Sequence, residues 1–180
     1  MPENNNIQEA VSAFDRAIRL KPDFAEAYHN RGFVKSKLGR DEAAIVDFNQ
    51  AIHLKPDFAD TYFGRGVAKG NLGDYKAALA DYDQAIRLKP DFAQAYNNRG
   101  IAKGKLGQPK AALADFDQAI RLKSDHADAY FGRGMAKQEL GHTEEARTDF
   151  KLAAELADKA GNANLKARVE QQLQELDNTD

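Results

Sequence analysis

The chain has 180 residues, 30% of them charged, and a formal net charge of −2 at pH 7, so it lacks the basic field that is typical of nucleic-acid-binding proteins. It contains no cysteine, which excludes disulfides, thiolate chemistry and zinc sites built from cysteine. No stretch approaches the roughly 20 apolar residues that a membrane-spanning helix needs, and the first residues lack the pattern of a secretion signal. We therefore expect a cytoplasmic protein without membrane insertion.

The dominant feature is an internal repeat. Four copies of a 34-residue pattern occupy residues 21–54, 55–88, 89–122 and 123–156, and the second and third copies are identical at 25 of 34 positions. A unit of this size is too small to bury a core alone and must pack against its neighbours. We therefore predict a single repeat domain over residues 1–180, although the near-identity of the copies is also compatible with a recently duplicated or engineered array.

The array begins with half a unit. Residues 7–20 match only the second half of the pattern, through Ala10, Phe14, Ala17, Ile18 and Leu20. This match predicts one helix that lacks the partner helix found in every complete unit.

Each complete unit is predicted to form two helices. An Asp near its start (Asp23 in the first copy) precedes an acid or amide by three residues, which predicts a capping box. The first helix then runs about 13 residues to a Leu-Gly pair such as Leu38-Gly39, where glycine permits a left-handed stop. The second helix repeats small and aromatic residues at helical spacing, as in Ala44 and Phe48.

The segment after the fourth copy is predicted to be a capping helix. Leu165, Val169, Leu173 and Leu176 form one apolar stripe over residues 163–176. Polar residues on the other side, among them Arg168, Gln171 and Glu175, are expected to face water, as the end of a repeat array requires.

This pattern resembles the tetratricopeptide repeat, and the resemblance covers nearly the whole chain. In the first copy it rests on Tyr28, Gly32, Gly39, Ala44, Phe48, Ala51 and Pro56. The resemblance implies an all-α fold, a right-handed superhelical α-solenoid of antiparallel helix pairs. It also implies a concave groove, formed by the first helices of the units, in which extended peptides or partner helices bind.

Two basic positions depart from the usual family pattern in every copy. Arg31 and Lys35, with their equivalents, stand where leucine and tyrosine are common, and each second helix carries an Asp such as Asp47. We interpret the Arg and Asp residues as ion-pair partners, because an unpaired charge at a packing position is costly. The alternative is that the eight cations form an exposed ladder for a polyanion such as RNA.

Differences between the copies define the candidate site. Most differences in the first helix, such as Phe63/Asn97 and Val67/Ile101, fall on one face, opposite the invariant residues that must pack. The resemblance makes this face the peptide-binding groove, with the candidate residues His29, Asn30, Phe33, Asp60, Phe63, Val67, Gln94, Asn97, Asn98, Ile101, Asp128, Phe131 and Met135. The alternative is that the apolar members only stiffen contacts between neighbouring first helices.

The chemistry of the candidate residues favours an apolar or mixed ligand. Exposed apolar stripes mark interaction sites, and asparagine amides can bond the backbone of an extended peptide. The resemblance also includes proteins that clamp the carboxylate of a chaperone tail with lysines, asparagines and an arginine, but here only Asn30 and Asn98 match that clamp. An acidic chaperone tail is therefore not the expected partner.

No sequence feature indicates catalysis, a metal or a cofactor. The four histidines lack metal-ligand spacing, and the Gly-Arg-Gly segments at 64–66 and 132–134 lie within predicted helices rather than after a strand. We expect a non-enzymatic scaffold that binds a peptide or helix of another protein, without nucleic acid. The alternative is self-association into a dimer or filament through the exposed half unit.

Overall fold

The computed structural model describes residues 2–178, with side chains from Gln8 to Asn178. All regular secondary structure in this range is α-helical. The helices are α1 (Pro2–Leu20), α2 (Ala25–Lys37), α3 (Asp41–Leu54), α4 (Ala59–Asn71), α5 (Tyr75–Leu88), α6 (Ala93–Lys105), α7 (Pro109–Leu122), α8 (Ala127–Glu139), α9 (Thr143–Lys159) and α10 (Ala163–Asp177). None of the described helices is both long and apolar enough to cross a membrane.

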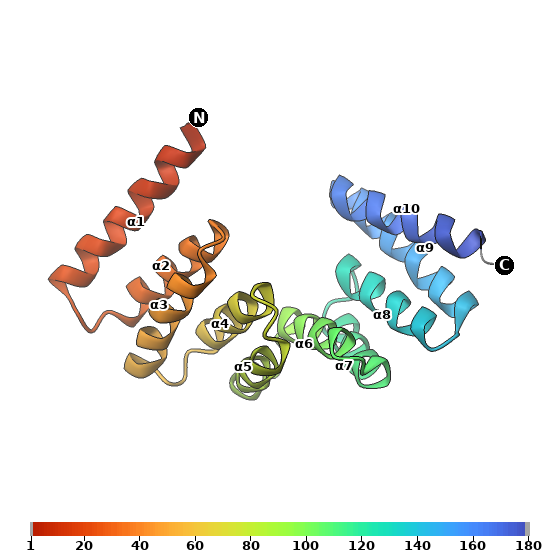
Figure 1. Cartoon of the computed structure of the whole chain (residues 1–180), viewed down its shortest axis with the longest axis horizontal. Coiled ribbons are helices and arrows are strands. Elements are labelled where there is room, and N and C mark those ends of the chain that lie inside the picture. Colours follow the sequence, from red (N-terminus) through yellow and green to blue (C-terminus); the bar gives the residue numbers. More distant parts are fainter. Residues whose placement is uncertain (1, 179–180) are drawn as a thin grey trace. The chain divides into compact units, whose positions relative to one another are not determined.

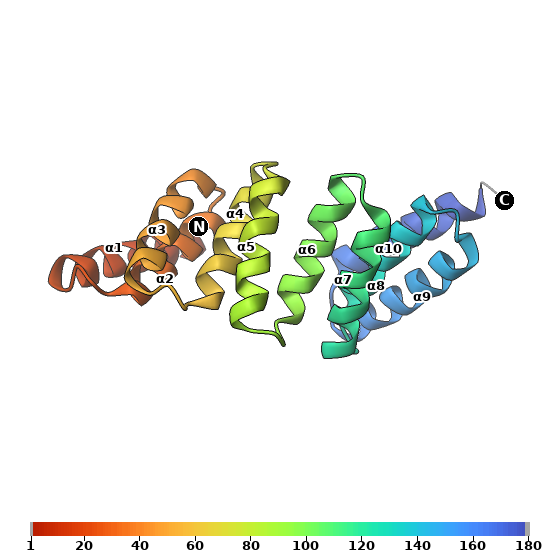
Figure 2. The same cartoon turned by 90° about the horizontal axis from the view of Figure 1, so that it is seen from below.

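The helices divide between two compact units, residues 1–90 with α1 to α5 and residues 91–180 with α6 to α10. Within each unit, consecutive helices pack as antiparallel neighbours (Figures 1 and 2). The first unit holds the half repeat and two complete repeats, and the second holds two complete repeats and the capping helix. This confirms the predicted all-α solenoid architecture at the level of each unit.

The first helix of each repeat ends where the sequence predicts. All four are 13 residues long, and the glycine that follows has a positive φ, for example 70° at Gly39. At this turn the amide of Gly39 donates to the carbonyl of Ser36 (2.9 Å) and that of Arg40 to Lys35 (3.0 Å). These two bonds form a Schellman motif, which satisfies the last carbonyl groups of the helix.

The predicted capping boxes are wrong. The residue before each first helix is Phe24, Phe58, Phe92 or His126, and none of these side chains caps the helix. The aspartates of the expected boxes stand one residue earlier, outside the helix. In the third repeat the aromatic ring is instead used for packing, since Phe92 is only 6% exposed, whereas Phe24 of the first repeat is 36% exposed.

The core is built from one aromatic ring per repeat, set against glycine. The rings of Phe48, Tyr82, Phe116 and Phe150 are buried on the second helices. A Cβ atom added to the facing glycine of the same repeat, as at Gly100, would come within about 3 Å of the ring (2.9 Å to Phe116 Cε1). Glycine therefore permits the helices to approach closely enough to bury the ring.

The predicted ion pairs are confirmed in all four repeats. Arg31 donates through Nε and Nη2 to the two oxygens of Asp47, at 2.9 and 2.6 Å, and the Nζ atom of Lys35 lies 2.7 Å from Asp47 Oδ2. The corresponding Arg and Lys of the other repeats both pair with the buried Asp of their own second helix. The eight cations are thus engaged within the chain and do not form the exposed ladder that we considered for a polyanion.

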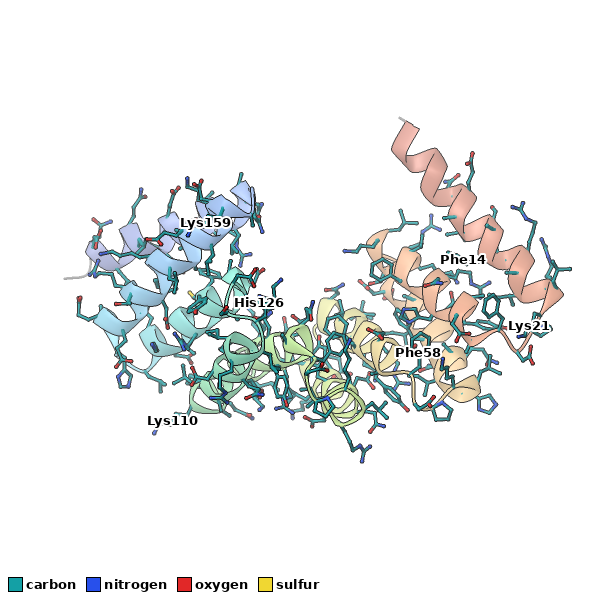
Figure 3. The ribbon with its side chains drawn as sticks, turned by 180° about the vertical axis from the view of Figure 1, so that it is seen from behind. Phe14, Lys21, Phe58, Lys110, His126 and Lys159 are labelled. Carbon is teal, nitrogen blue, oxygen red and sulfur yellow. The ribbon has the colours of Figure 1, made fainter. Side chains whose placement is uncertain are left out.

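The two end helices differ in how they are covered. Leu165, Val169 and Leu176 of α10 are buried against α9, which confirms the predicted capping helix. In α1, by contrast, Phe14 (labelled in Figure 3) is only half-buried. Its repeat equivalent Phe48 has no exposed surface. The half unit therefore leaves an apolar face of α1 partly open.

Candidate functional site

A cavity of about 860 Å³ lies in the second unit, among α6, α8 and α10. Its apolar lining includes Ile101, Phe131 and Met135, and Phe116 lies against the glycines beneath. Ile101 and Met135 occupy equivalent positions in successive repeats and are 41% and 40% exposed. Two large apolar side chains thus stay open to solvent on one surface of the unit, which is typical of an interaction site.

Three glycines line this cavity, and packing against Phe116 explains two of them. A Cβ atom at Gly100 or Gly132 would lie 2.9 or 2.4 Å from Cε1 of Phe116, so both glycines are required by packing. At Gly104 no atom outside its immediate neighbourhood in the helix lies within 4 Å of the added Cβ. The space beside Gly104 is therefore left open by the chain itself.

The charged part of the lining comes from all three helices. Carboxylates outnumber cations, with Asp128, Glu139 and Glu175 against Lys105 and Arg168. The guanidinium carbon of Arg168 lies 5.0 Å from the centre of the Phe131 ring. This stacking holds Arg168 at the wall of the cavity through a cation–π contact.

Glutamine amides also reach the cavity. On α10, Gln171 and Gln172 donate to the two carboxylate oxygens of Glu175. On α8, Gln138 Oε1 is buried and has no hydrogen-bond partner among the described residues. This oxygen is enclosed by the chain, so it is an unsatisfied buried acceptor and is not open to a group in the cavity.

The structure separates the candidate residues of the second unit into two groups. Ile101, Asp128, Phe131 and Met135 line the cavity, whereas Gln94, Asn97 and Asn98 do not. Gln94 is exposed and Asn98 is half-buried. Asn97 is 5% exposed and donates through Nδ2 to Asn98 Oδ1 (3.1 Å), so its amide serves a contact inside the chain.

Two other polar atoms of the second unit also lack a partner. His126 Nε2 and Asn97 Oδ1 are both buried without a hydrogen bond among the described residues. Burial lowers the pKa of His126 below its ordinary value, and the negative charge of Asp128 opposes this effect. The other three repeats carry phenylalanine at this position.

In the first unit the candidate residues lie on α2 and α4. Phe33 is 51% exposed, Asn30 and Asp60 are exposed, and Val67 is half-buried. The half-buried ring of Phe63 packs 6.1 Å from that of Tyr82, centre to centre. This ring therefore contributes to packing as well as to the surface.

His29, the remaining candidate of the first unit, is held in a contact between repeats. Its Nδ1 atom lies 3.0 Å from Thr61 Oγ1, and its ring centre is 4.7 Å from that of Phe58. Burial lowers the pKa of His29. Thr61 has no exposed surface and differs from alanine in the other copies, a difference that the sequence reasoning overlooked.

The sequence reasoning also missed the side of the cavity wall that α10 supplies. Arg168, Gln171 and Glu175 are exposed as predicted, but together with Gln172 they face the cavity from α10. These residues could have been predicted from the sequence. The α10 helix follows α9 in the way that the first helix of a further unit would, so its polar positions can be aligned with those of α8.

The residues that line the cavity include no Ser, Thr, Cys, His or Tyr, and their ionisable side chains are Lys105, Asp128, Glu139, Arg168 and Glu175. Among the described residues, no three His, Asp or Glu side chains are placed to hold a metal ion.

Family models agree with the repeat pattern. Models described as TPR repeat match residues 3–39, 36–73 and 70–107, and models described as tetratricopeptide repeat match residues 93–126 and 127–159. A curated relative, protein FlbA of Caulobacter vibrioides, is 49% identical over 45 residues, which span 23% of this chain and 8% of FlbA.

Solved structures share the fold at low identity. The crystal structure of MamA is 24% identical, with a TM-score of 0.79 over 89% of this chain and 94% of that chain. The first TPR of Spaghetti (RPAP3), solved with the HSP90 peptide SRMEEVD, is 22% identical, with a TM-score of 0.64 over 65% of this chain and 93% of that chain.

Proposed function

This chain belongs to the tetratricopeptide repeat family, and we propose that it is a non-enzymatic interaction module that holds a peptide or helix of a partner protein in the cavity among α6, α8 and α10. The observation that carries the proposal is the pair of open apolar side chains, Ile101 and Met135, on the wall of that cavity. One structural neighbour was solved with a bound peptide, which supports peptide binding by this fold although not by an acidic tail here.

Binding in this cavity would use apolar burial surrounded by polar contacts. A partner side chain that covers Ile101 and Met135 removes apolar surface from water on both sides, and this burial favours the complex. The polar groups of α10 then lie beside the partner backbone, where they form hydrogen bonds at the rim.

The equivalent surface of the first unit remains a predicted contact region. It carries Phe33 as its most exposed apolar side chain, together with the predicted residues of α2 and α4. We propose that it offers a second, weaker contact, because among the described residues of α2 and α4 Phe33 is the one large apolar side chain more exposed than Ile101. Replacement of Phe33 by Ser tests this region separately.

The main test compares a double variant of exposed apolar residues in the cavity with a single control variant outside it. The Ile101→Ser, Met135→Ser variant is compared with Val46→Ser, which removes a 66% exposed valine of α3 outside the cavity. Partners are captured from a lysate of source cells and identified, and the affinity of the purified partner segment is measured by fluorescence anisotropy. We expect at least a tenfold loss for the double variant and no change for Val46→Ser. Equal affinity of the three proteins would refute the cavity assignment.

A second candidate function is self-association through α1. This candidate is favoured by the side chain of Phe14, which is only half-buried, and by that of Leu20, which is 88% exposed. A second copy could cover this face. Sedimentation velocity over a range of concentrations tests the candidate, since a monomer at high micromolar concentration contradicts it.

A further inference from the structure

The open face of α1 differs from the corresponding face of every complete repeat. The α1 helix packs against α2 at the edge of the first unit (Figure 1), and its open face carries the exposed Ala13 beside the half-buried Phe14 and Ala17. Ala13 stands where the second helices of the complete repeats carry the buried aspartates, such as Asp47. The face therefore lacks the carboxylate that receives an arginine and a lysine in each complete repeat.

This difference restricts what can cover the face. An ordinary first helix would bring an arginine and a lysine against Ala13, where no aspartate is present to pair with them, and unpaired charges at a packing position are costly. A surface that stays in water at the edge of a repeat array favours a polar residue over alanine. Alanine at this position therefore indicates a contact with an apolar, uncharged surface.

The helix α10 of a second copy does not fit this face. Counted from the start of each helix, Glu170 of α10 takes the position of Gly134 in α8. A Cβ atom at Gly134 would lie 2.5 Å from Cε1 of Phe150, which is the repeat equivalent of Phe14. Glu170 would therefore collide with the ring of Phe14, and this collision disfavours the stacking of copies end to end into a filament.

The residues of the open face are spaced for packing against a second helix of the same kind. They recur at alternating intervals of three and four residues, which is the spacing of a seam between two packed helices: Ala10, Ala13, Ala17 and Leu20. The alanines allow two helices to approach closely, and Leu20 continues the seam with a side chain that is 88% exposed. The seam is apolar throughout, so the same seam of a second copy matches it.

Charges beside the seam determine the direction of the second helix. Glu9 and Arg16 are both exposed and lie seven residues, or about two turns, apart on the same side of α1. In a parallel pair each of them would face the identical charge of the second copy. In an antiparallel pair centred near Ala13, Glu9 of either copy faces Arg16 of the other, so opposite charges meet at two places.

We propose that two copies of this chain form a closed two-fold dimer, in which α1 packs antiparallel against α1 of the second copy with the two Ala13 residues near the centre. This inference rests on the second candidate function, self-association through α1, and specifies its partner surface and its direction. The contact uses the open face of both copies, so it ends at two chains.

The first test uses the absence of cysteine from the chain. Ala13→Cys places a single thiol at the centre of the proposed contact, and Ser12→Cys places it at the neighbouring exposed position, which points away from the seam. Under mild oxidation we expect Ala13→Cys to form covalent dimers about tenfold faster than Ser12→Cys, because a disulfide requires Cα atoms within about 7 Å of each other. Non-reducing gels measure both rates.

The second test reverses the charges beside the seam. Glu9→Arg brings like charges together at two places and should weaken the dimer about tenfold in sedimentation velocity. The Glu9→Arg, Arg16→Glu variant restores opposite charges and should recover the affinity of the unchanged chain. Arg19→Glu changes an exposed charge on the side of α1 away from the seam and should have no effect. Far-UV circular dichroism checks that each variant is folded.

Three results overturn the inference, and they differ in what they leave standing. If the unchanged chain stays monomeric at high micromolar concentration, self-association fails as a function as well. If the chain associates but Ala13→Cys links no faster than Ser12→Cys, or the double charge reversal does not recover the affinity, self-association stands and the antiparallel contact is wrong. If species larger than two chains grow with concentration, the copies stack head to tail and the dimer is not closed.

Discussion

Two glycine-to-alanine changes in the same cavity should shift stability in opposite directions. At Gly132 an added Cβ would lie 2.4 Å from Cε1 and 2.6 Å from Cζ of Phe116, about 1 Å closer than an ordinary carbon contact. The Phe116 ring is 3% exposed and is also packed against Gly100, so it has little room to move. At Gly104 the added Cβ meets open space.

Overpacking a core typically costs about 1–3 kcal/mol, and alanine in place of a helical glycine gains about 0.5–1 kcal/mol. Gly132→Ala should therefore lower the free energy of unfolding by about 1–2 kcal/mol. Gly104→Ala should raise it by about 0.5 kcal/mol, because Gly104 lies in the last turn of α6, where the helix gain is smaller.

The assay is urea unfolding followed by far-UV circular dichroism. Phe116→Leu serves as a second background, because the smaller side chain relieves the contact and should reduce the penalty of Gly132→Ala. If Gly132→Ala is as stable as the unchanged chain, or if Gly104→Ala is the more damaging of the two, the close approach between helix and ring is not what restricts these positions.

Three further outcomes are expected. Asp115→Asn weakens the bidentate pair with Arg99 and should lower the free energy of unfolding, measured in urea titrations, by about 2 kcal/mol. An effect below about 0.5 kcal/mol, the size typical of an exposed ion pair, would contradict a structural role of this pair. His126→Phe should stabilise the chain by about 1 kcal/mol, since it removes an unpartnered buried nitrogen. Burial lowers the pKa of His126 in the folded chain, so the unfolded chain binds the proton more tightly. The free energy of unfolding therefore falls as the pH drops below 6.5, the ordinary pKa of histidine. The gain in stability from His126→Phe should for this reason be larger at pH 5 than at pH 8. Phe14→Ser should shift any concentration-dependent sedimentation to that of a monomer.

The repeated features could be predicted because each copy of the pattern provides an independent observation. The helix lengths, the left-handed glycines and the ion pairs between Arg and Asp all recur at the same position in four units. A residue that every unit retains must serve the packing common to all units. The capping box failed although it also recurs, since spacing along the chain does not reveal that the aromatic residue after the Asp, and not the Asp itself, stands immediately before the helix.

The site was harder to predict because it depends on positions that differ between units. The variable face of a first helix is covered by whatever follows it in space, and that differs along the array. His29 contacts Thr61 of the next repeat, and Phe131 is flanked by Arg168 of α10. Periodicity alone showed which residues share a face but not which of them a neighbouring helix would cover.

Some differences between the repeats are explained by packing inside the chain, and the contacts show which ones. Phe63 and Phe131 each precede a glycine, Gly64 or Gly132, whose missing side chain makes room for the ring of the preceding repeat. That difference from the Asn-bearing copies is explained by packing inside the chain and needs no ligand. Ile101 and Met135 are different, because both side chains stay open to solvent on the wall of the cavity. We propose that a partner covers these two side chains, and for this reason the sharpest test of function is directed at them.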